Sequence, residues 1–109
     1  MKMEPSPYIV LFITTATAEE AQRISRALLE QKRVACVNIV PRVSSSFWWQ
    51  DKLDSAEESL LIVKTKASQL NEIVTIVKEI HSYDIPELIA LPIIGGNQDY
   101  LDWIEKEVK

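Results

Sequence analysis

Cys36 and His81 are the only cysteine and the only histidine in the chain, and they carry its softest metal-binding groups. A thiolate and an imidazole together form the pair that copper and zinc prefer over carboxylates alone. The two residues lie far apart in the sequence, so no short metal-binding motif joins them. Two interpretations stay open. Either both residues bind a metal, or Cys36 is a structural thiol and His81 is a loop histidine that hydrogen-bonds locally.

Asp84 and Glu87 place two further carboxylates in the segment HSYDIPE, directly after His81. Carboxylates from one loop can face a single cation. This role agrees with the composition, in which 16 Asp and Glu outnumber 12 Lys and Arg and leave a net charge of -4. The alternative is that both carboxylates cap a helix end or are only solvated.

The same residues could also form a catalytic set, with Cys36 as nucleophile, His81 as base and Glu87 as the group that orients the base. However, Cys36 lies inside a predicted strand, and no glycine-rich elbow or oxyanion loop accompanies it. Acylphosphatase chemistry needs an arginine-bearing phosphate loop after the first strand, and the sequence there is TTATAEE. We therefore expect a protein that is not an enzyme.

Three bulky aromatic residues, Phe47, Trp48 and Trp49, follow one another in a predicted strand. Neighbouring strand residues point to opposite faces, so we expect at least one tryptophan to be buried by a neighbouring molecule. A base-stacking role is disfavoured because the chain is acidic and these residues have no basic flanks. We expect interface anchors and no nucleic-acid partner. Tyr100, Trp103 and Ile104 share one helical face and are expected in the core.

Four strand-like segments alternate with helical ones and must position these residues. YIVLFITT at 8–15 is a near-continuous apolar run, typical of a central strand covered on both faces. Thr17 and Glu20 have capping-box spacing for a helix that reaches about Lys32. VACVNIV at 34–40 continues past Pro41, where an edge or a bulge is expected, into SSSFWW. QDKLD can then turn, and LLIVKTK at 60–66 returns as the second arm of a long hairpin.

The second half of the chain predicts another helix over 68–81, with Ser68 as its cap, and a fourth strand over 88–94. Gly95 to Asn97 then separate that strand from a last helix. The order βαββαβ predicts an α+β fold, a ferredoxin-like sandwich with an extra C-terminal helix and a long β-hairpin. Both crossover helices cover the same sheet face. The other face is left apolar and uncovered, which favours self-association.

Residues 1–7 are expected to be a disordered lead-in, and residues 8–109 a single domain. No apolar run is long enough for a membrane span, so no membrane partner is expected. The lead-in does not have the pattern of a signal peptide. A lone cysteine cannot form a disulfide within its chain, which favours a cytoplasmic location.

Three segments resemble the CutA family of divalent-cation tolerance proteins. They are ACVNIVPRVSSSFWWQDKLD at 35–54, ESLLIVKTK at 58–66, and HSYDIPELIALPI together with YLDW within 81–103. The resemblance implies a ferredoxin-like subunit in a tight homotrimer that is similar in architecture to the PII signalling proteins. It also implies a role in tolerance to copper and other divalent ions, with clefts between subunits where ligands from different chains can meet.

Individual positions carry this resemblance. Cys36 matches the cysteine of the ACVN segment, Trp49 and Lys52 match the hairpin tryptophan and lysine, and Lys64 matches the lysine of the strand. In the loop, the residues that match the family signature are His81, Tyr83, Pro86 and Glu87. The departures are Ser82 for a usual proline, Asp84 for glutamate, Phe47 for tyrosine and Asp51 for glycine. Ser82 makes the loop less rigid, and the carboxylate of Asp84 reaches less far.

The sequence therefore predicts a trimeric protein that responds to copper or another divalent cation, with no organic cofactor. Cys36, His81, Asp84 and Glu87 are its candidate ligands. One alternative is a PII-like sensor whose clefts hold a small anionic or nucleotide ligand near Tyr83, Lys64 and Lys52, although no GxGxxG or Walker pattern is present. The other is a structural trimeric scaffold without a ligand. In every case Phe47, Trp48 and Trp49 are expected at the trimer interface.

Overall fold

The computed structural model describes residues 6–109 and contains four strands and three α-helices in the predicted order. Their bounds are β1 Tyr8–Thr15, α1 Ala18–Glu30, β2 Cys36–Trp49, β3 Lys52–Lys66, α2 Leu70–Ile80, β4 Leu88–Pro92 and α3 Gln98–Glu107. A short 3-10 turn, Ala67–Gln69, precedes α2. No helix within residues 6–109 is long and apolar enough to cross a membrane.

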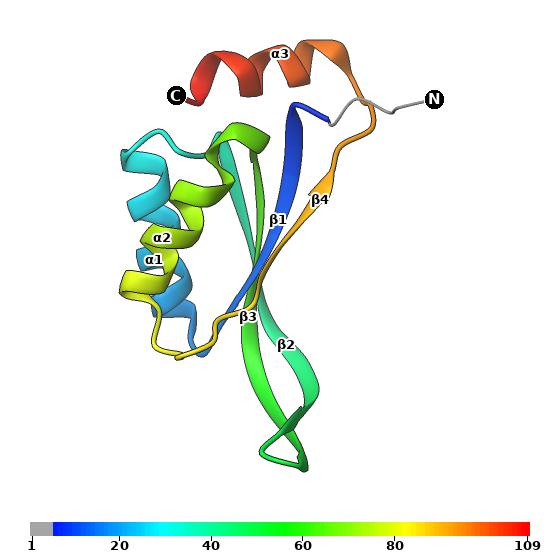
Figure 1. The fold of residues 1–109 in the computed structure, drawn as a ribbon. Coiled ribbons are helices and arrows are strands. Elements are labelled where there is room, and N and C mark those ends of the chain that lie inside the picture. The colour runs from blue at the N-terminus through cyan, green and yellow to red at the C-terminus, as the bar shows by residue number, and fades with distance from the viewer. Residues whose placement is uncertain (1–5) are drawn as a thin grey trace.

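The strands form one antiparallel sheet in the order β2-β3-β1-β4. Helices α1 and α2 lie side by side against one face of this sheet, and α3 crosses one of its ends (Figure 1). This arrangement confirms the α+β, ferredoxin-like βαββαβ sandwich with an additional C-terminal helix. The central position predicted for the first strand is also confirmed, because β1 pairs with both β3 and β4.

The core lies between the sheet and the two helices. Alternate residues of β1 and β3 point toward the helices, whose apolar residues recur every three or four positions and so meet them. The largest fully buried members are Leu11, Ile13, Leu61 and Val63 from the sheet and Ile24, Leu28, Ile73 and Val77 from the helices. Burying each of these side chains contributes about 1.5–3 kcal/mol to folding.

The opposite side of the sheet, here called the uncovered face, carries the remaining apolar residues of the strands. The interpretation of β1 as covered on both faces is therefore wrong within the single chain, where α1 and α2 cover only one. Residues directly opposite each other on neighbouring strands point to the same face of the sheet. The register therefore shows which residues lie on the uncovered face. They are Val10, Phe12, Val40, Leu60, Ile62, Ile89 and Leu91, all half-buried or exposed.

The β2–β3 hairpin projects beyond the body of the molecule (Figure 1), as the long hairpin of the sequence prediction requires. Its register shifts between Val40 and Val43, where Arg42 has a φ of 61°, so the bulge expected at Pro41 is present. β2 is also an edge strand. The hairpin closes through Gln50 and Asp51, with φ values of 50° and 63°, in a tight two-residue turn.

Several local predictions need correction. Helix α1 ends at Glu30, and β4 ends at Pro92, each two residues before its predicted end. Ser68 does not cap the second helix, because it lies inside the 3-10 turn. No side chain caps the start of that turn or the start of α2. In α3, Ile104 is buried as predicted, but Tyr100 and Trp103 are about two-fifths exposed.

The predicted lead-in is only partly open to comparison, because residues 1–5 lie outside the described residues. Ser6 and Pro7, which were assigned to it, are held in place. Ser6 Oγ donates a hydrogen bond of 2.7 Å to the carbonyl of Ile93, and the Pro7 carbonyl accepts one of 2.8 Å from the N–H of Ala67. The residue before β1 therefore already belongs to the folded part.

Candidate functional site

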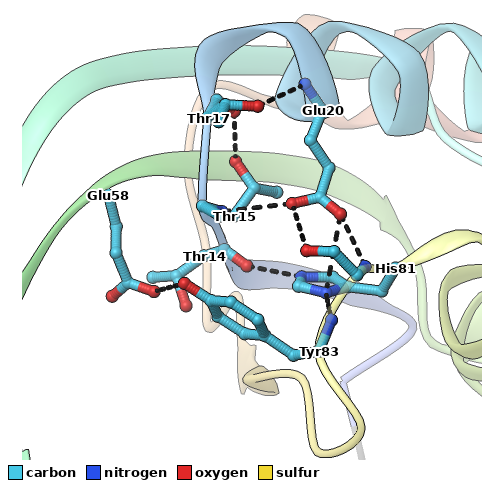
Figure 2. A network of polar contacts seen from close by, with 9 residues as sticks. Thr14, Thr15, Thr17, Glu20, Glu58, His81 and Tyr83 are labelled. Carbon is cyan, nitrogen blue, oxygen red and sulfur yellow. Dashed lines mark hydrogen bonds and ion pairs between the residues drawn. The ribbon is translucent and has the colours of Figure 1, made fainter.

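Glu20 lies in the first turn of α1, and only 3% of its surface is exposed. The N-terminal cap places it there, because Thr17 Oγ1 accepts a 3.1 Å hydrogen bond from the N–H of Glu20. Its carboxylate accepts hydrogen bonds from the Ala16 N–H at 3.1 Å, the Ser82 N–H at 2.6 Å and the Ser82 hydroxyl at 3.0 Å (Figure 2). Glu20 thereby joins the start of α1 to the loop after α2.

Two opposing effects act on the pKa of Glu20. Burial alone would raise it, but the hydrogen bonds from Ser82 and Ala16 and the nearby His81 lower the pKa of Glu20 below its usual range. The lowered value means that the folded protein holds this group as a carboxylate. An ionised carboxylate accepts all the bonds that the loop donates.

His81, the first residue of the loop, has a fully buried side chain. Its Nδ1 accepts a 3.0 Å hydrogen bond from the Tyr83 N–H, so in the neutral ring Nε2 carries the proton. Nε2 then donates a 2.7 Å hydrogen bond to the carbonyl of Thr14. Both ring nitrogens make hydrogen bonds in this conformation, and the metal-binding role of His81 stays a prediction. The alternative, a histidine hydrogen-bonded locally, describes the geometry.

Tyr83 crosses from the loop to the hairpin, where its hydroxyl donates a 2.8 Å hydrogen bond to Glu58 Oε2 (Figure 2). Glu58 lies in β3 and is only 8% exposed. Burial and the neighbouring Glu58 carboxylate raise the pKa of Tyr83 to about 12, so its hydroxyl stays protonated and remains a donor at neutral pH. The Tyr83 ring packs against the His81 ring at 4.9 Å between centroids.

A cleft of about 700 Å³ opens between the base of the hairpin and this loop. It brings together Asp84 and Glu87, the two predicted carboxylates, with the predicted residues Tyr83, Phe47 and Trp49. Two carboxylates that the sequence analysis did not select, Asp54 and Glu58, complete its acidic lining. The remaining lining residues are Thr14, Ser45, Ser46 and Ile85.

Three other predicted residues do not reach this cleft within one chain. Cys36 is paired with Lys64, whereas Thr14 at the cleft is paired with Leu60, a separation of about 13 Å along β3. Lys64 donates a hydrogen bond from its amine to Asn38 Oδ1, beside Cys36. Lys52 lies next to the hairpin turn, opposite Trp49. No group of three or more His, Cys, Asp or Glu residues in the described chain is arranged to hold a metal.

The tryptophans point to opposite faces of the hairpin, as their adjacency predicts. Trp49 shares its face with Phe47 and lines the cleft, and it is 50% exposed. Trp48 lies on the other face and is 73% exposed. Neither is buried within its own chain, so the prediction that a neighbouring subunit covers at least one of them stays a prediction.

The sequence contains a signal for each of the two buried carboxylates of the site, Glu58 and Glu20. Glu57 and Glu58 are adjacent within strand β3, so one of the two must point to the apolar, uncovered face. Glu20 was identified as part of a capping box, but its contact with Ser82 depends on residues 62 positions apart. Only the packing of α1 beside α2 brings them together.

The chain is similar in sequence to a known protein family. The family model described as CutA1 divalent ion tolerance protein matches residues 9–107. The chain is 44% identical over 99 residues to the divalent-cation tolerance protein CutA of Archaeoglobus fulgidus, covering 91% of this chain and 96% of that protein. It is 43% identical over 103 residues to the chloroplastic CutA 1 of Oryza sativa, covering 94% of this chain but 58% of the rice protein. It spans 62% of the chloroplastic CutA of Arabidopsis thaliana.

Solved structures of CutA proteins are also similar to this chain. The crystal structure of CutA1 from Oryza sativa superposes with a TM-score of 0.92 at 42% identity, covering 96% of both chains. The periplasmic divalent cation tolerance protein CutA from Archaeoglobus fulgidus superposes with a TM-score of 0.91 at 43% identity, covering 94% of this chain and 99% of that one.

Proposed function

The chain belongs to the CutA1 divalent ion tolerance family, and from that premise we propose that it acts in tolerance to divalent metal ions as a homotrimeric, cation-responsive binding protein. Copper is the first candidate ion, and other divalent cations are further candidates. The observation that carries the proposal is the acidic cleft between hairpin and loop, whose walls include Asp54, Glu58, Asp84 and Glu87.

The uncovered face supports the trimer. Large apolar side chains such as Ile89, 52% exposed, and Leu91, 41% exposed, form a contiguous surface with the neighbouring strands. A soluble monomer rarely exposes such a surface, and a second copy of the same chain can cover it. The exposed hairpin aromatics Phe47 and Trp49 extend this surface, and together with Trp48 on the other face of the hairpin they are our candidates for the subunit contact.

The cation site is proposed to need more than one subunit. A single chain offers exposed carboxylates at Asp84 and Glu87, but the residues described in it include no complete ligand set. Carboxylate oxygens bind divalent cations, and Cu²⁺ binds a given set of oxygen and nitrogen ligands more tightly than its first-row neighbours. Asp84 and Glu87 of one subunit are therefore assigned as ligands that groups from another complete. Cys36, half-buried at the other end of the sheet, is a separate candidate for Cu(I) or another soft ion.

Calorimetric titration with Cu(II), combined with light-scattering mass, tests this proposal. We expect a mass of three chains and saturable binding at a fixed ratio per trimer, weakened at least about tenfold in Asp84→Asn/Glu87→Gln. The control variant Glu30→Gln/Glu79→Gln removes the same charge from exposed helix positions and should bind as the wild type does. Unsaturable uptake, or equal weakening in both variants, would contradict a cation site at the cleft.

The PII-like alternative receives less support from this geometry. Of the residues expected to hold an anionic ligand, only Tyr83 lines the cleft, and the carboxylates around it repel anions. A thermal-shift screen with nucleotides discriminates, because a ligand bound only by the folded trimer raises its melting temperature. A trimer that binds neither metal nor nucleotide would leave the scaffold role. A cytoplasmic location and a non-enzymatic role stay predictions, testable by fractionation and by activity screens.

A further inference from the structure

Three consecutive residues form the stem of the loop that carries Asp84. His81 hydrogen-bonds to β1, Ser82 to α1 and Tyr83 to β3, so three different elements hold three residues in a row (Figure 2). Asp84 follows this stem directly and is exposed at the cleft. The stem therefore determines where the Asp84 carboxylate stands.

The Glu20 carboxylate binds the middle of this stem at two points. Its Oε2 accepts a 2.6 Å hydrogen bond from the Ser82 N–H, and its Oε1 accepts one of 3.0 Å from the Ser82 hydroxyl. Glu20 is itself held by the Ala16 N–H and by the helix cap at Thr17. Because two hydrogen bonds to one carboxylate fix geometry as well as distance, this contact restrains the backbone of Ser82.

Neither Glu20 nor Ser82 is among the described residues that line the cleft. Glu20 is also only 3% exposed, so it can affect a cation in the cleft only through the loop. Groups that orient the ligands of a metal site without touching the metal typically contribute ten- to a hundredfold to its affinity. A proline at position 82 would have neither the N–H nor the hydroxyl, so this contact depends on the residue found here.

We propose that Glu20 and Ser82 form a clamp that sets the affinity of the cleft for divalent cations. They are positioning residues that act through Asp84, and the inference rests on the cation site proposed above. With the clamp closed, Asp84 is in place before the cation arrives. With the clamp open, part of the binding free energy goes into ordering the loop, so affinity falls while the number of sites stays the same.

Calorimetric titration with Cu(II) measures the effect of opening the clamp. Glu20→Gln replaces one accepting oxygen by an NH₂ group, and we expect the Kd to rise about tenfold at unchanged stoichiometry. Ser82→Ala removes the hydroxyl and keeps the N–H, so the Kd should rise about threefold. In the double variant the Kd should rise by less than the product of the two single effects, because both substitutions act on one contact.

Two control variants separate positioning from charge and from stability. Glu19→Gln removes the same charge from the exposed neighbour of Glu20. Ile24→Val shortens a fully buried side chain of α1 and lowers stability without touching the loop. Both should bind Cu(II) with the wild-type Kd, at a mass that light scattering shows to be unchanged.

Hydrogen exchange of the Ser82 amide tests the clamp without any metal. The amide that donates the 2.6 Å bond should be protected in the wild type, exchange faster in Glu20→Gln and keep its protection in Glu19→Gln. Ser82 is exposed, so Ser82→Ala tests the clamp by titration even if Glu20→Gln does not fold.

Two kinds of failure are distinguishable. A wild-type Kd in Glu20→Gln and Ser82→Ala, equal weakening in Ile24→Val, or unchanged exchange of the Ser82 amide in Glu20→Gln would overturn the clamp and leave the cation site in place. Unsaturable uptake of Cu(II) by the wild-type protein would contradict the cation site itself, and the clamp's role in affinity would fall with it.

Discussion

Glu20 is the residue on which the position of the 81–87 loop depends most directly. Glu20→Gln exchanges one accepting oxygen for an NH₂ group that faces donors from Ala16 and Ser82. Leaving buried donors without an acceptor costs about 1–3 kcal/mol each, so we expect the free energy of unfolding at pH 7 to fall by about 2 kcal/mol. Urea denaturation measures this loss. The exposed neighbour substitution Glu19→Gln should change it by less than about 0.5 kcal/mol.

The same substitution has a defined pH dependence. Because folding lowers the pKa of Glu20, its contribution to stability is complete above the unfolded pKa, about 4.3, and is lost as the pH falls through the lower folded value. The difference in unfolding free energy between wild type and Glu20→Gln should therefore narrow below about pH 4.3. A difference that stays constant from pH 6 to pH 3 would show that Glu20 is not held as a carboxylate.

Tyr83 makes the corresponding prediction at alkaline pH. Its pKa is raised from the usual 10.0 to about 12, so the stability that its hydroxyl contributes is complete below pH 10 and lost as the pH rises toward 12. Tyr83→Phe should cost about 1–2 kcal/mol at neutral pH, because the bond is made to a carboxylate. Its stability curve should then be flatter than that of wild type between pH 10 and 12. Parallel curves would contradict the Tyr83–Glu58 bond.

At this scale the sequence predicted residue types better than residue partners. The spacing of Thr17 and Glu20 was enough to predict the cap, because a helix start is a local structure. The role of His81 was left between a ligand and a hydrogen-bonded loop residue, since its partner, the Thr14 carbonyl, lies 67 positions away. No pattern in one sequence reveals a contact at that separation before the sheet is assembled.

Among the elements, the turn of the β2–β3 hairpin has a conformation that a substitution can test. Asp51 adopts a φ of 63°, a conformation that is costly for residues with a Cβ atom and free for glycine. We expect Asp51→Gly to raise the free energy of unfolding by about 0.5–1 kcal/mol, measured by thermal or urea denaturation. Ser55→Gly, in the extended part of β3, should instead lower it by a similar amount. A loss in both variants would contradict the assigned turn.

Sequence periodicity located the elements, but their ends depend on contacts. Pro41 predicted an edge strand or a bulge correctly, because a residue without an N–H is tolerated in a sheet mainly at those places, and β2 has both features. Ser68 suggested a cap, but the chain enters α2 through a 3-10 turn in which the Gln69 side chain bonds Arg33 and the Lys109 carbonyl. The helical spacing of Tyr100 and Trp103 was read as core, yet α3 crosses only an end of the sheet and leaves them partly exposed (Figure 1).

For the whole molecule, the uncovered face is the feature that predicts assembly. Leu91→Glu places a charge on this face, and burying an unpaired charge at a subunit contact is costly, so we expect the mass in solution to fall from three chains to one. Leu29→Glu is the matched control, because Leu29 on α1 is 40% exposed and Leu91 is 41% exposed. It should leave the mass unchanged. Identical masses for both variants would assign the subunit contact to another surface.

The most direct test of a trimer that binds divalent cations at its acidic cleft is native mass spectrometry with Cu(II), which reads chain number and bound metal together. The expected species is three chains with a fixed number of copper ions, and the same trimer without them for Asp84→Asn/Glu87→Gln. A single chain, or a trimer whose copper content rises without limit and ignores the two substitutions, would contradict the central claim.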